Sequence, residues 1–184
     1  MLTVLKNPLS DNYKRLKEYI LGDVFTWVYL EQSTPDDDVD VDVCHPFKGS
    51  TEYNNISFFN HSFLTRPIPT KRYSHSNDHP ELLERCTWAL DDIFTFNDIK
   101  YDCIFRIAAN LVFPTTGPQL TYPHVDHPWE HKNLIIYLTD AGGKTICEEE
   151  FHDPEEDDVL LMEGRHHLEL PKEKRRVVLV ATYV

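Results

Sequence analysis

The chain contains 184 residues, which suits one compact domain better than two. A hydrophobic fraction of 41% is enough to build a core and argues against wholesale disorder. The 18 basic and 31 acidic residues give a formal net charge of −13, which makes a nucleic acid or an anionic membrane an unfavourable main partner. No apolar run approaches the roughly 18 residues that a membrane-spanning helix needs. The first residues also lack the charged and then apolar layout of a signal peptide.

The four cysteines, Cys44, Cys86, Cys103 and Cys147, lie far apart and form no CxxC pair. They are too sparse for a disulfide framework and too scattered for a zinc ribbon. We therefore expect free thiols and a reducing, cytoplasmic location. Ten histidines are a generous supply for this length, so the histidines are the first place to look for chemistry.

The first half of the chain predicts two helices and two strands. Apolar residues at three- and four-residue steps predict a helix over residues 10–21, and Gly22 ends it. Residues 25–30 and 56–64 have the composition of strands. The acidic stretch 36–42 and the polar stretch 67–77 are predicted to be loops. A second helix is predicted to begin at Pro80, with one apolar stripe from Leu82 to Phe94.

The second half predicts only strands. They cover residues 101–113, 133–139, 144–147, 159–162, 167–170 and 176–184. Residues 140–143 predict a hairpin, and the acidic run 148–158 predicts a solvated loop. We therefore expect an α+β, mainly β fold, a double-stranded β-helix (jelly roll) with supporting N-terminal helices. The whole chain would form one domain, with residues 1–99 as helical and β support and residues 100–184 as the catalytic core strands.

The candidate chemistry begins at His124-Val125-Asp126. On an extended strand, residues i and i+2 point to the same face, so this imidazole and this carboxylate converge. His167 from another strand would complete a set of two histidines and one carboxylate. Such a set leaves coordination positions open on a divalent metal, as non-haem Fe(II) oxygenases need. The His-x-Asp pair alone is no more frequent than composition predicts, so the context must decide.

The context is given by the residues that follow His167. Pro171 follows His167 by four residues, Arg176 follows it by nine, and a strand rich in β-branched residues ends the chain. Together with His124 and Asp126, this layout resembles the Fe(II)- and 2-oxoglutarate-dependent dioxygenases, in particular their prolyl-hydroxylase-like branch. The resemblance covers residues 101–183, under half of the chain.

The resemblance implies an iron site at His124, Asp126 and His167, and roles for three further residues. Arg176 would bind the far carboxylate of 2-oxoglutarate, whose other carboxylate and keto oxygen chelate the metal. A buried carboxylate needs such a partner, and a guanidinium satisfies it with two parallel hydrogen bonds. Tyr137 would donate to the same carboxylate or be an ordinary sheet tyrosine. Asn110 occupies a position at which some family members contact the cosubstrate.

Several alternatives stay open at this point. His166 competes with His167 as the third ligand, and Arg175 competes with Arg176, because neighbouring strand residues face opposite ways. The spacing to proline and arginine favours His167. Tyr122 and Trp129 are candidate substrate contacts at the mouth of the site.

A competing motif lies beside the His-x-Asp pair. The segment 127–131 matches H-x-x-E-H, but this zinc-hydrolase motif needs a long helix, and Pro128 and the following strand leave no room for one.

The expected function is an Fe(II)- and 2-oxoglutarate-dependent dioxygenase, a hydroxylase that consumes 2-oxoglutarate and O2. Its substrate would be a protein or peptide side chain or a small molecule, and the net charge of −13 counts against a nucleic acid without excluding it. One alternative is a catalytically silent, cupin-like jelly-roll module that binds a ligand or partner. Another is a cupin-type metalloenzyme that uses oxygen without 2-oxoglutarate.

Overall fold

The structure is a computed structural model that describes residues 1–31, 53–66, 80–116 and 120–184. In chain order, its elements are β1 (Leu2–Leu5), α1 (Asp11–Leu21), β2 (Val28–Leu30), β3 (Tyr53–Asn54), β4 (Phe58–Leu64), α3 (Pro80–Phe96), β5 (Ile104–Val112), β6 (Leu120–Thr121), β7 (Lys132–Tyr137), β8 (Thr145–Cys147), β9 (Glu150–His152), β10 (Val159–Met162), β11 (His166–Leu168) and β12 (Arg176–Tyr183). The predicted loops 36–42 and 67–77 and Cys44 lie outside the described residues.

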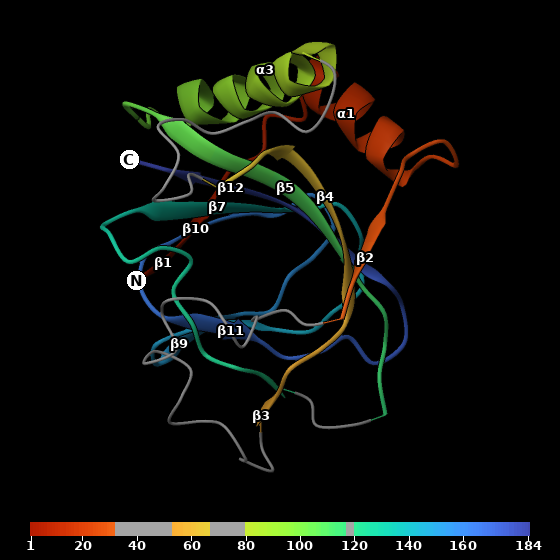
Figure 1. Ribbon diagram of the computed structural model, residues 1–184. Coiled ribbons are helices and arrows are strands. Elements are labelled where there is room, and N and C mark those ends of the chain that lie inside the picture. Colours follow the sequence, from red (N-terminus) through yellow and green to blue (C-terminus); the bar gives the residue numbers. More distant parts are fainter. Residues whose placement is uncertain (32–52, 67–79, 117–119) are drawn as a thin grey trace.

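The strands form a jelly roll of two main sheets. A seven-stranded sheet has the order β1-β10-β7-β12-β5-β4-β2, and a three-stranded sheet has the order β11-β8-β9. Short β6 pairs in parallel with β3 and bridges the end of β11 through Leu120 and Glu169. The chain therefore crosses from one sheet to the other repeatedly, and both helices lie on the outer face of the large sheet (Figure 1). The predicted fold class, mainly β with N-terminal helices, is confirmed.

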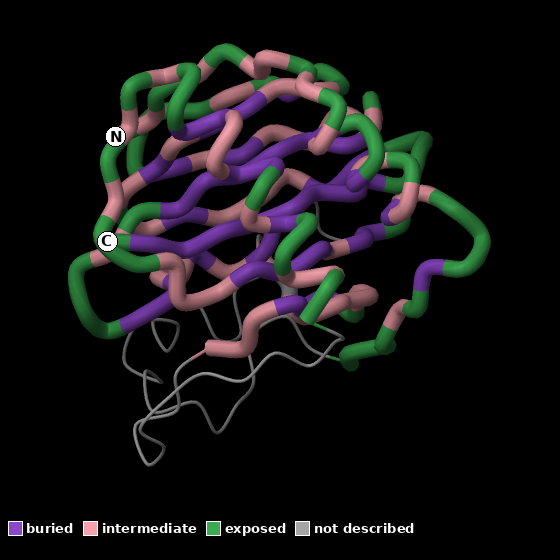
Figure 2. The backbone as a smooth tube through the Cα atoms, turned by 90° about the horizontal axis from the view of Figure 1, so that it is seen from above, coloured by how far each residue is buried: buried purple, intermediate pink, exposed green. Residues whose placement is uncertain are grey.

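The large sheet has an apolar layer on each face because its strands alternate. In β12, Leu179 packs in the cluster beneath the helices, whereas Val178 and Val180 belong to a second cluster inside the roll. In β7, Ile136 and Ile135 divide in the same way. Buried stretches accordingly run along neighbouring strands of this sheet (Figure 2). This second, inward face of the sheet is the wall on which a site can be built.

The two helices form where the sequence predicts them. Helix α1 begins after Ser10, whose hydroxyl accepts a hydrogen bond from the Tyr13 backbone N–H, and it is followed by Gly22. Helix α3 runs from Pro80 to Phe96 and buries a stripe that faces the large sheet. The two helices are joined by a hydrogen bond from the Asn12 amide to the Asp92 carboxylate, at 3.0 Å. They cover the sheet from outside and contribute no side chain to the interior of the roll.

The cap at Ser10 gives a first testable prediction. Ser10→Ala removes the acceptor for one unpaired N–H of the first turn, and such a loss costs about 1 kcal/mol of stability. Denaturant unfolding should therefore show a lower midpoint with an unchanged slope. Ser10→Asp, which keeps an acceptor at the same position, is the matched control and should stay near the wild type.

Three details of the strand prediction are wrong. Residues 140–143 do not join a hairpin, because β7 pairs with β10 and β12 while β8 pairs with β11 and β9. They cross between sheets, and Gly143 has a φ of +81° and approaches so closely that a Cβ would lie 2.4 Å from the Glu169 carbonyl oxygen. The acidic run contains strand β9 (Glu150–His152), which pairs with β8. Strand β1, which the sequence did not predict, pairs with β10 at the sheet edge.

Among the described residues, Cys103 and Cys147 carry free thiols. Neither helix of the described residues is long and apolar enough to cross a bilayer.

Candidate metal centre

A cavity of about 130 Å³ lies between the two sheets of the roll. Its walls are the inward faces of β5, β7, β10 and β12 on one side and residues of β6, β8 and β11 on the other. The apolar lining includes Ile135, Met162, Val178 and Val180. The charged and polar lining consists of Arg66, Arg106, Asn110, Thr121, His124, Asp126, Thr145, His166, His167 and Arg176. The cavity is thus an apolar slot with polar groups gathered at a few points.

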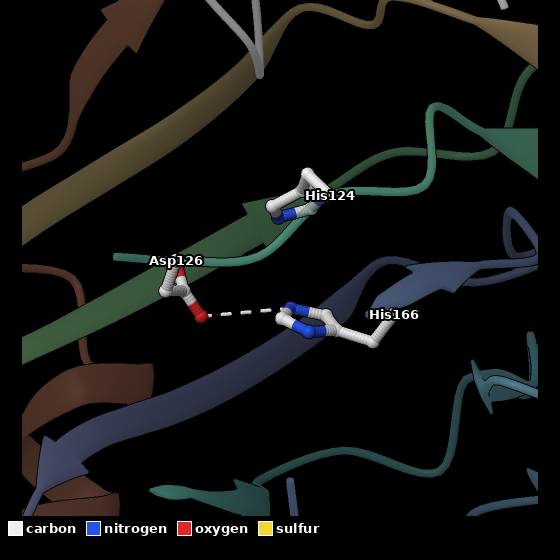
Figure 3. Close-up of side chains that lie close together, drawn as sticks. All are labelled: His124, Asp126 and His166. Carbon is white, nitrogen blue, oxygen red and sulfur yellow. Dashed lines mark ion pairs between the residues drawn. The ribbon is translucent and has the colours of Figure 1, made fainter. Parts of the chain in front are cut away.

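Three of these side chains converge. His124, Asp126 and His166 each offer one ligand atom, and these atoms all lie within 4.8 Å of one another. His124 and His166 also form an isolated antiparallel bridge, with both backbone N–H···O distances at 2.9 Å. The bridge ties the His-x-Asp segment to β11, so two distant parts of the sequence are held in register. Figure 3 shows the Asp126 carboxylate facing the His166 ring, with His124 beside them.

Backbone hydrogen bonds fix both imidazoles in the same tautomer. The Nδ1–H of His124 donates to the Tyr122 carbonyl at 3.0 Å, and the Nδ1–H of His166 donates to the Gly164 carbonyl at 3.2 Å. Both hydrogen bonds occupy Nδ1 and leave Nε2 as the nitrogen through which each ring would bind a metal. Burial lowers the pKa of His166 to about 4, so this ring is neutral at pH 7.

The arrangement brings an imidazole nitrogen and a carboxylate oxygen face to face. His166 Nε2 lies 3.5 Å from Asp126 Oδ2. A cation near both atoms would be stabilised by them. Two imidazoles and one carboxylate are the donor set of the facial triad that binds non-haem iron. The residues present therefore fit a divalent metal.

Asp126 is held in place by two arginines that the sequence motifs did not indicate. Arg66 Nη2 donates to Asp126 Oδ1 at 2.7 Å, and Arg106 Nη1 donates to the same oxygen at 3.1 Å. Burial alone raises the pKa of Asp126, but the positive charges around it, Arg106 foremost, hold that pKa well below its usual range. Asp126 is thus ionised, with Oδ1 taken by guanidinium groups and Oδ2 facing His166.

The structure corrects the choice between the two neighbouring histidines. It brings His166, not His167, together with His124 and Asp126. The physical reason is the bridge to His124, which sets the His166 ring 4.6 Å from that of its bridge partner, whereas His167 lies outside the ligand cluster. His167 still lines the cavity, and its ring lies 5.7 Å from that of Tyr53. The nine-residue spacing from His167 to Arg176 does not determine which histidine faces inward. A turn lies between the two strands, and the alternation of side chains does not continue through it.

Of the two neighbouring arginines, Arg176 lines the cavity and Arg175 is exposed. Arg176 is 4% exposed, donates from Nη2 to Thr145 Oγ1 at 2.8 Å, and lies 5.2 Å from the centre of the Tyr137 ring. Its Nε and Nη1 are buried without a hydrogen-bond partner among the described residues. Burial lowers its pKa from the ordinary value, although a guanidinium stays charged at neutral pH. An unpaired buried charge of this kind indicates a place for an anion.

The other predicted residues lie at different distances from the cavity. Asn110 lines it and accepts a hydrogen bond from the Asn60 amide at 2.7 Å. The Tyr137 hydroxyl lies 2.7 Å from Thr145 Oγ1, within the Arg176 cluster. Tyr122 contributes its backbone carbonyl to His124. Trp129 lies 39% exposed and stacks on His127, away from the described lining. The roles predicted for these four residues stay predictions.

The segment 127–131 is not a zinc-hydrolase helix. It has no helical residues, and His127 and His131 meet edge to face with ring centres 4.9 Å apart. Among the described residues, the cluster capable of holding a metal is the one formed by His124, Asp126 and His166.

The fold can be compared with solved structures. An oxidoreductase of the 2OG-Fe(II) oxygenase family from Burkholderia pseudomallei superposes with a TM-score of 0.52, over 71% of this chain and 67% of that chain, at 15% sequence identity. This chain shares its fold with a 2OG-Fe(II) oxygenase. The resemblance seen in the sequence is thus confirmed at the level of the fold.

Two prolyl hydroxylases align at lower scores. The enzyme from Trichoplax adhaerens, solved with a peptide of hypoxia inducible factor, has a TM-score of 0.44 at 12% identity, over 94% of this chain and 90% of that chain. A prolyl-4-hydroxylase from Pseudomonas putida has a TM-score of 0.42 at 11% identity, over 93% and 98%. The sequence matches no protein-family model and none of the curated proteins.

Proposed function

We propose that this protein is an Fe(II)- and 2-oxoglutarate-dependent dioxygenase that hydroxylates a protein or peptide side chain or a small molecule. His124, Asp126 and His166 would hold the iron, and Arg176 would bind the far carboxylate of 2-oxoglutarate. Residues 100–184 would form the catalytic core of a single domain, with residues 1–99 as its support. We propose a cytoplasmic location, consistent with the free thiols of Cys103 and Cys147.

One observation carries the proposal: the same cavity holds a converging metal-ligand set and an unpaired buried guanidinium. Either feature alone is compatible with a protein of a different class, since a metal site occurs in silent binding modules and a buried arginine can be structural. Together they match a cosubstrate that needs a metal at one end and a cation at the other. The cavity that both features line also has apolar walls, which include Val178 and Val180.

Each residue has a definite task in this proposal. Iron with 2-oxoglutarate would supply the oxidising chemistry, with succinate and carbon dioxide as co-products. The Tyr122 and Gly164 carbonyls keep the Nε2 lone pairs of His124 and His166 aimed at the metal position. Arg66 and Arg106 keep Asp126 ionised and oriented. Thr145 orients the Arg176 guanidinium through Nη2, which leaves Nε and Nη1 for the cosubstrate carboxylate.

A turnover assay tests the proposal against the silent-module alternative. Purified protein should release succinate in the presence of Fe(II), 2-oxoglutarate and O2, even without its true substrate, and omission of any one component should abolish the release. Asp126→Ala should reduce it to background, because the carboxylate that holds the metal is lost. Metal binding without succinate release under all these conditions would favour a silent jelly-roll module instead.

The cupin-type alternative predicts that oxygen consumption does not depend on 2-oxoglutarate. If oxygen were used without 2-oxoglutarate, oxygen consumption would continue when Arg176 is replaced and when 2-oxoglutarate is omitted. The proposal predicts that both changes stop it. An oxygen electrode measurement on wild type and Arg176→Met, with Arg175→Met as the exposed control, separates the two cases.

A further inference from the structure

Arg66 and Arg106 together carry one more positive charge than the Asp126 carboxylate beside them can neutralise. Arg66 follows β4 and Arg106 lies in β5, yet both guanidinium groups donate to one oxygen of Asp126. Among the described residues, Asp126 is the only carboxylate that forms an ion pair with either group. One carboxylate therefore faces two guanidinium groups, and a guanidinium has five N–H donors.

The charge of the cavity is opposite to that of the protein. Its described lining contains three arginines and one aspartate, whose charges sum to plus two, whereas the whole chain carries −13. A divalent metal at Asp126 would add two further positive charges and would share the carboxylate that now neutralises the arginines. 2-Oxoglutarate, a dianion, would balance the metal alone. The surplus of two positive charges would then remain.

Arg176 and Arg106 are positioned for different ligands. In the pairing of β12 with β5, Arg176 lies opposite Val112 and Thr182 lies opposite Arg106. Arg106 and Val112 are six residues apart along β5, about 20 Å of strand at the usual rise. The two arginines therefore enter the cavity from opposite ends of the same strand pair. A cosubstrate carboxylate at Arg176 would leave Arg66 and Arg106 available.

We propose that the substrate carries an oxyanion group, a carboxylate or a phosphate, that binds to Arg66 and Arg106. This inference rests on the proposed function, since it names the substrate class of the same site. The Arg66 side chain is 41% exposed and the Arg106 side chain 12% exposed, so the pair extends from the outside of the cavity to its interior. An anionic group held there lies next to the metal ligand Asp126, which places the rest of the substrate beside the reaction centre.

The inference can be tested without metal or 2-oxoglutarate. The full chain, freed of metal, is titrated calorimetrically with inorganic phosphate, and separately with N-acetylglycine and N-acetylglycinamide, of which only the first carries a carboxylate. Phosphate and N-acetylglycine should bind, and the neutral N-acetylglycinamide should bind at least tenfold more weakly than N-acetylglycine. The anionic probe that binds with the higher affinity indicates whether the substrate group is a phosphate or a carboxylate.

Variants locate the bound anion. Arg66→Gln and Arg106→Gln should each weaken binding at least tenfold, while exposed Arg175→Gln should not change it. Asp126→Asn should strengthen binding several-fold, because it removes the carboxylate that competes for both guanidinium groups. If Arg106→Gln does not fold, the partly exposed Arg66→Gln decides the question, with circular dichroism as the check on folding.

Two results would overturn the inference. One is the absence of binding by either anionic probe. The other is binding that Arg176→Gln abolishes and Arg66→Gln leaves intact, since the anion would then occupy the cosubstrate position. Both results are independent of the proposed function, which is tested by metal- and 2-oxoglutarate-dependent succinate release. A protein that binds anions at Arg66 without releasing succinate would contradict the function and keep the anion site.

Discussion

Replacing His166 with alanine is expected to lower the affinity for a divalent metal by more than about a hundredfold, whereas His167→Ala leaves it nearly unchanged. Loss of a residue that only supports a ligand costs about 10–100-fold, and loss of a ligand itself should exceed that. His166 Nε2 lies 3.5 Å from Asp126 Oδ2 in the converging set, and His167 lies outside that set.

The two variants form a matched pair, since they remove the same side chain from neighbouring positions of β11. Titration of the metal-free protein with Co(II), followed by its visible absorption, gives the affinity directly. His124→Ala should behave like His166→Ala. A loss of affinity confined to His167→Ala would show that the sequence spacing, and not the geometry of the structure, identifies the third ligand.

The second large effect concerns Arg176. Arg176→Met should abolish the binding of 2-oxoglutarate and yet leave the ligand-free protein as stable as the wild type or more so. The guanidinium is buried with Nε and Nη1 unpaired, and an apolar side chain of similar length removes the cost of desolvating that charge. Thr145 keeps a hydrogen-bond partner in the variant, because its hydroxyl also lies 2.7 Å from the Tyr137 hydroxyl.

Thermal unfolding with and without ligand measures both halves of this prediction. In the wild type with metal bound, added 2-oxoglutarate should raise Tm in a concentration-dependent way, because it binds the native state only. In Arg176→Met the shift should vanish while the Tm of the ligand-free protein does not fall. Arg175→Met should retain the shift. A marked loss of ligand-free stability in Arg176→Met would instead assign the arginine a structural role.

The sequence predicted the elements better than their pairing. The periodicity of α1 and the cap at Ser10 are local signals, so the predicted range 10–21 agrees with the helix Asp11–Leu21. The segment 140–143 has the composition of a hairpin turn, but which strands pair is decided by contacts distant in sequence. Here the backbone of Gly143 packs against the Glu169 carbonyl at the end of β11, which no local pattern encodes.

In the candidate site, too, the sequence predicted what a local pattern determines and not what contacts distant in sequence determine. The i and i+2 spacing placed His124 and Asp126 together because it spans a single extended segment. The choice between His166 and His167 required the alternation of a strand beyond a turn, and only the bridge from His124 to His166 fixes it.

Arg106 carries a signal in the sequence that could have found it. It and Asn110 are the polar residues of the otherwise apolar strand β5, four residues apart, and both line the cavity. Arg66 has no such signal, because its approach to Asp126 depends on how β4 ends. Arg106 could therefore have been predicted from the sequence, whereas Arg66 could not.

The central claim is that His124, Asp126 and His166 bind Fe(II) in the same cavity in which Arg176 binds 2-oxoglutarate. The most direct measurement is the visible absorption spectrum of the protein with Fe(II) and 2-oxoglutarate under anaerobic conditions. We expect the weak charge-transfer band of the iron–2-oxoglutarate chelate in wild type and in His167→Ala, and its absence in His166→Ala and Asp126→Ala. A wild-type spectrum as blank as that of Asp126→Ala would contradict the claim.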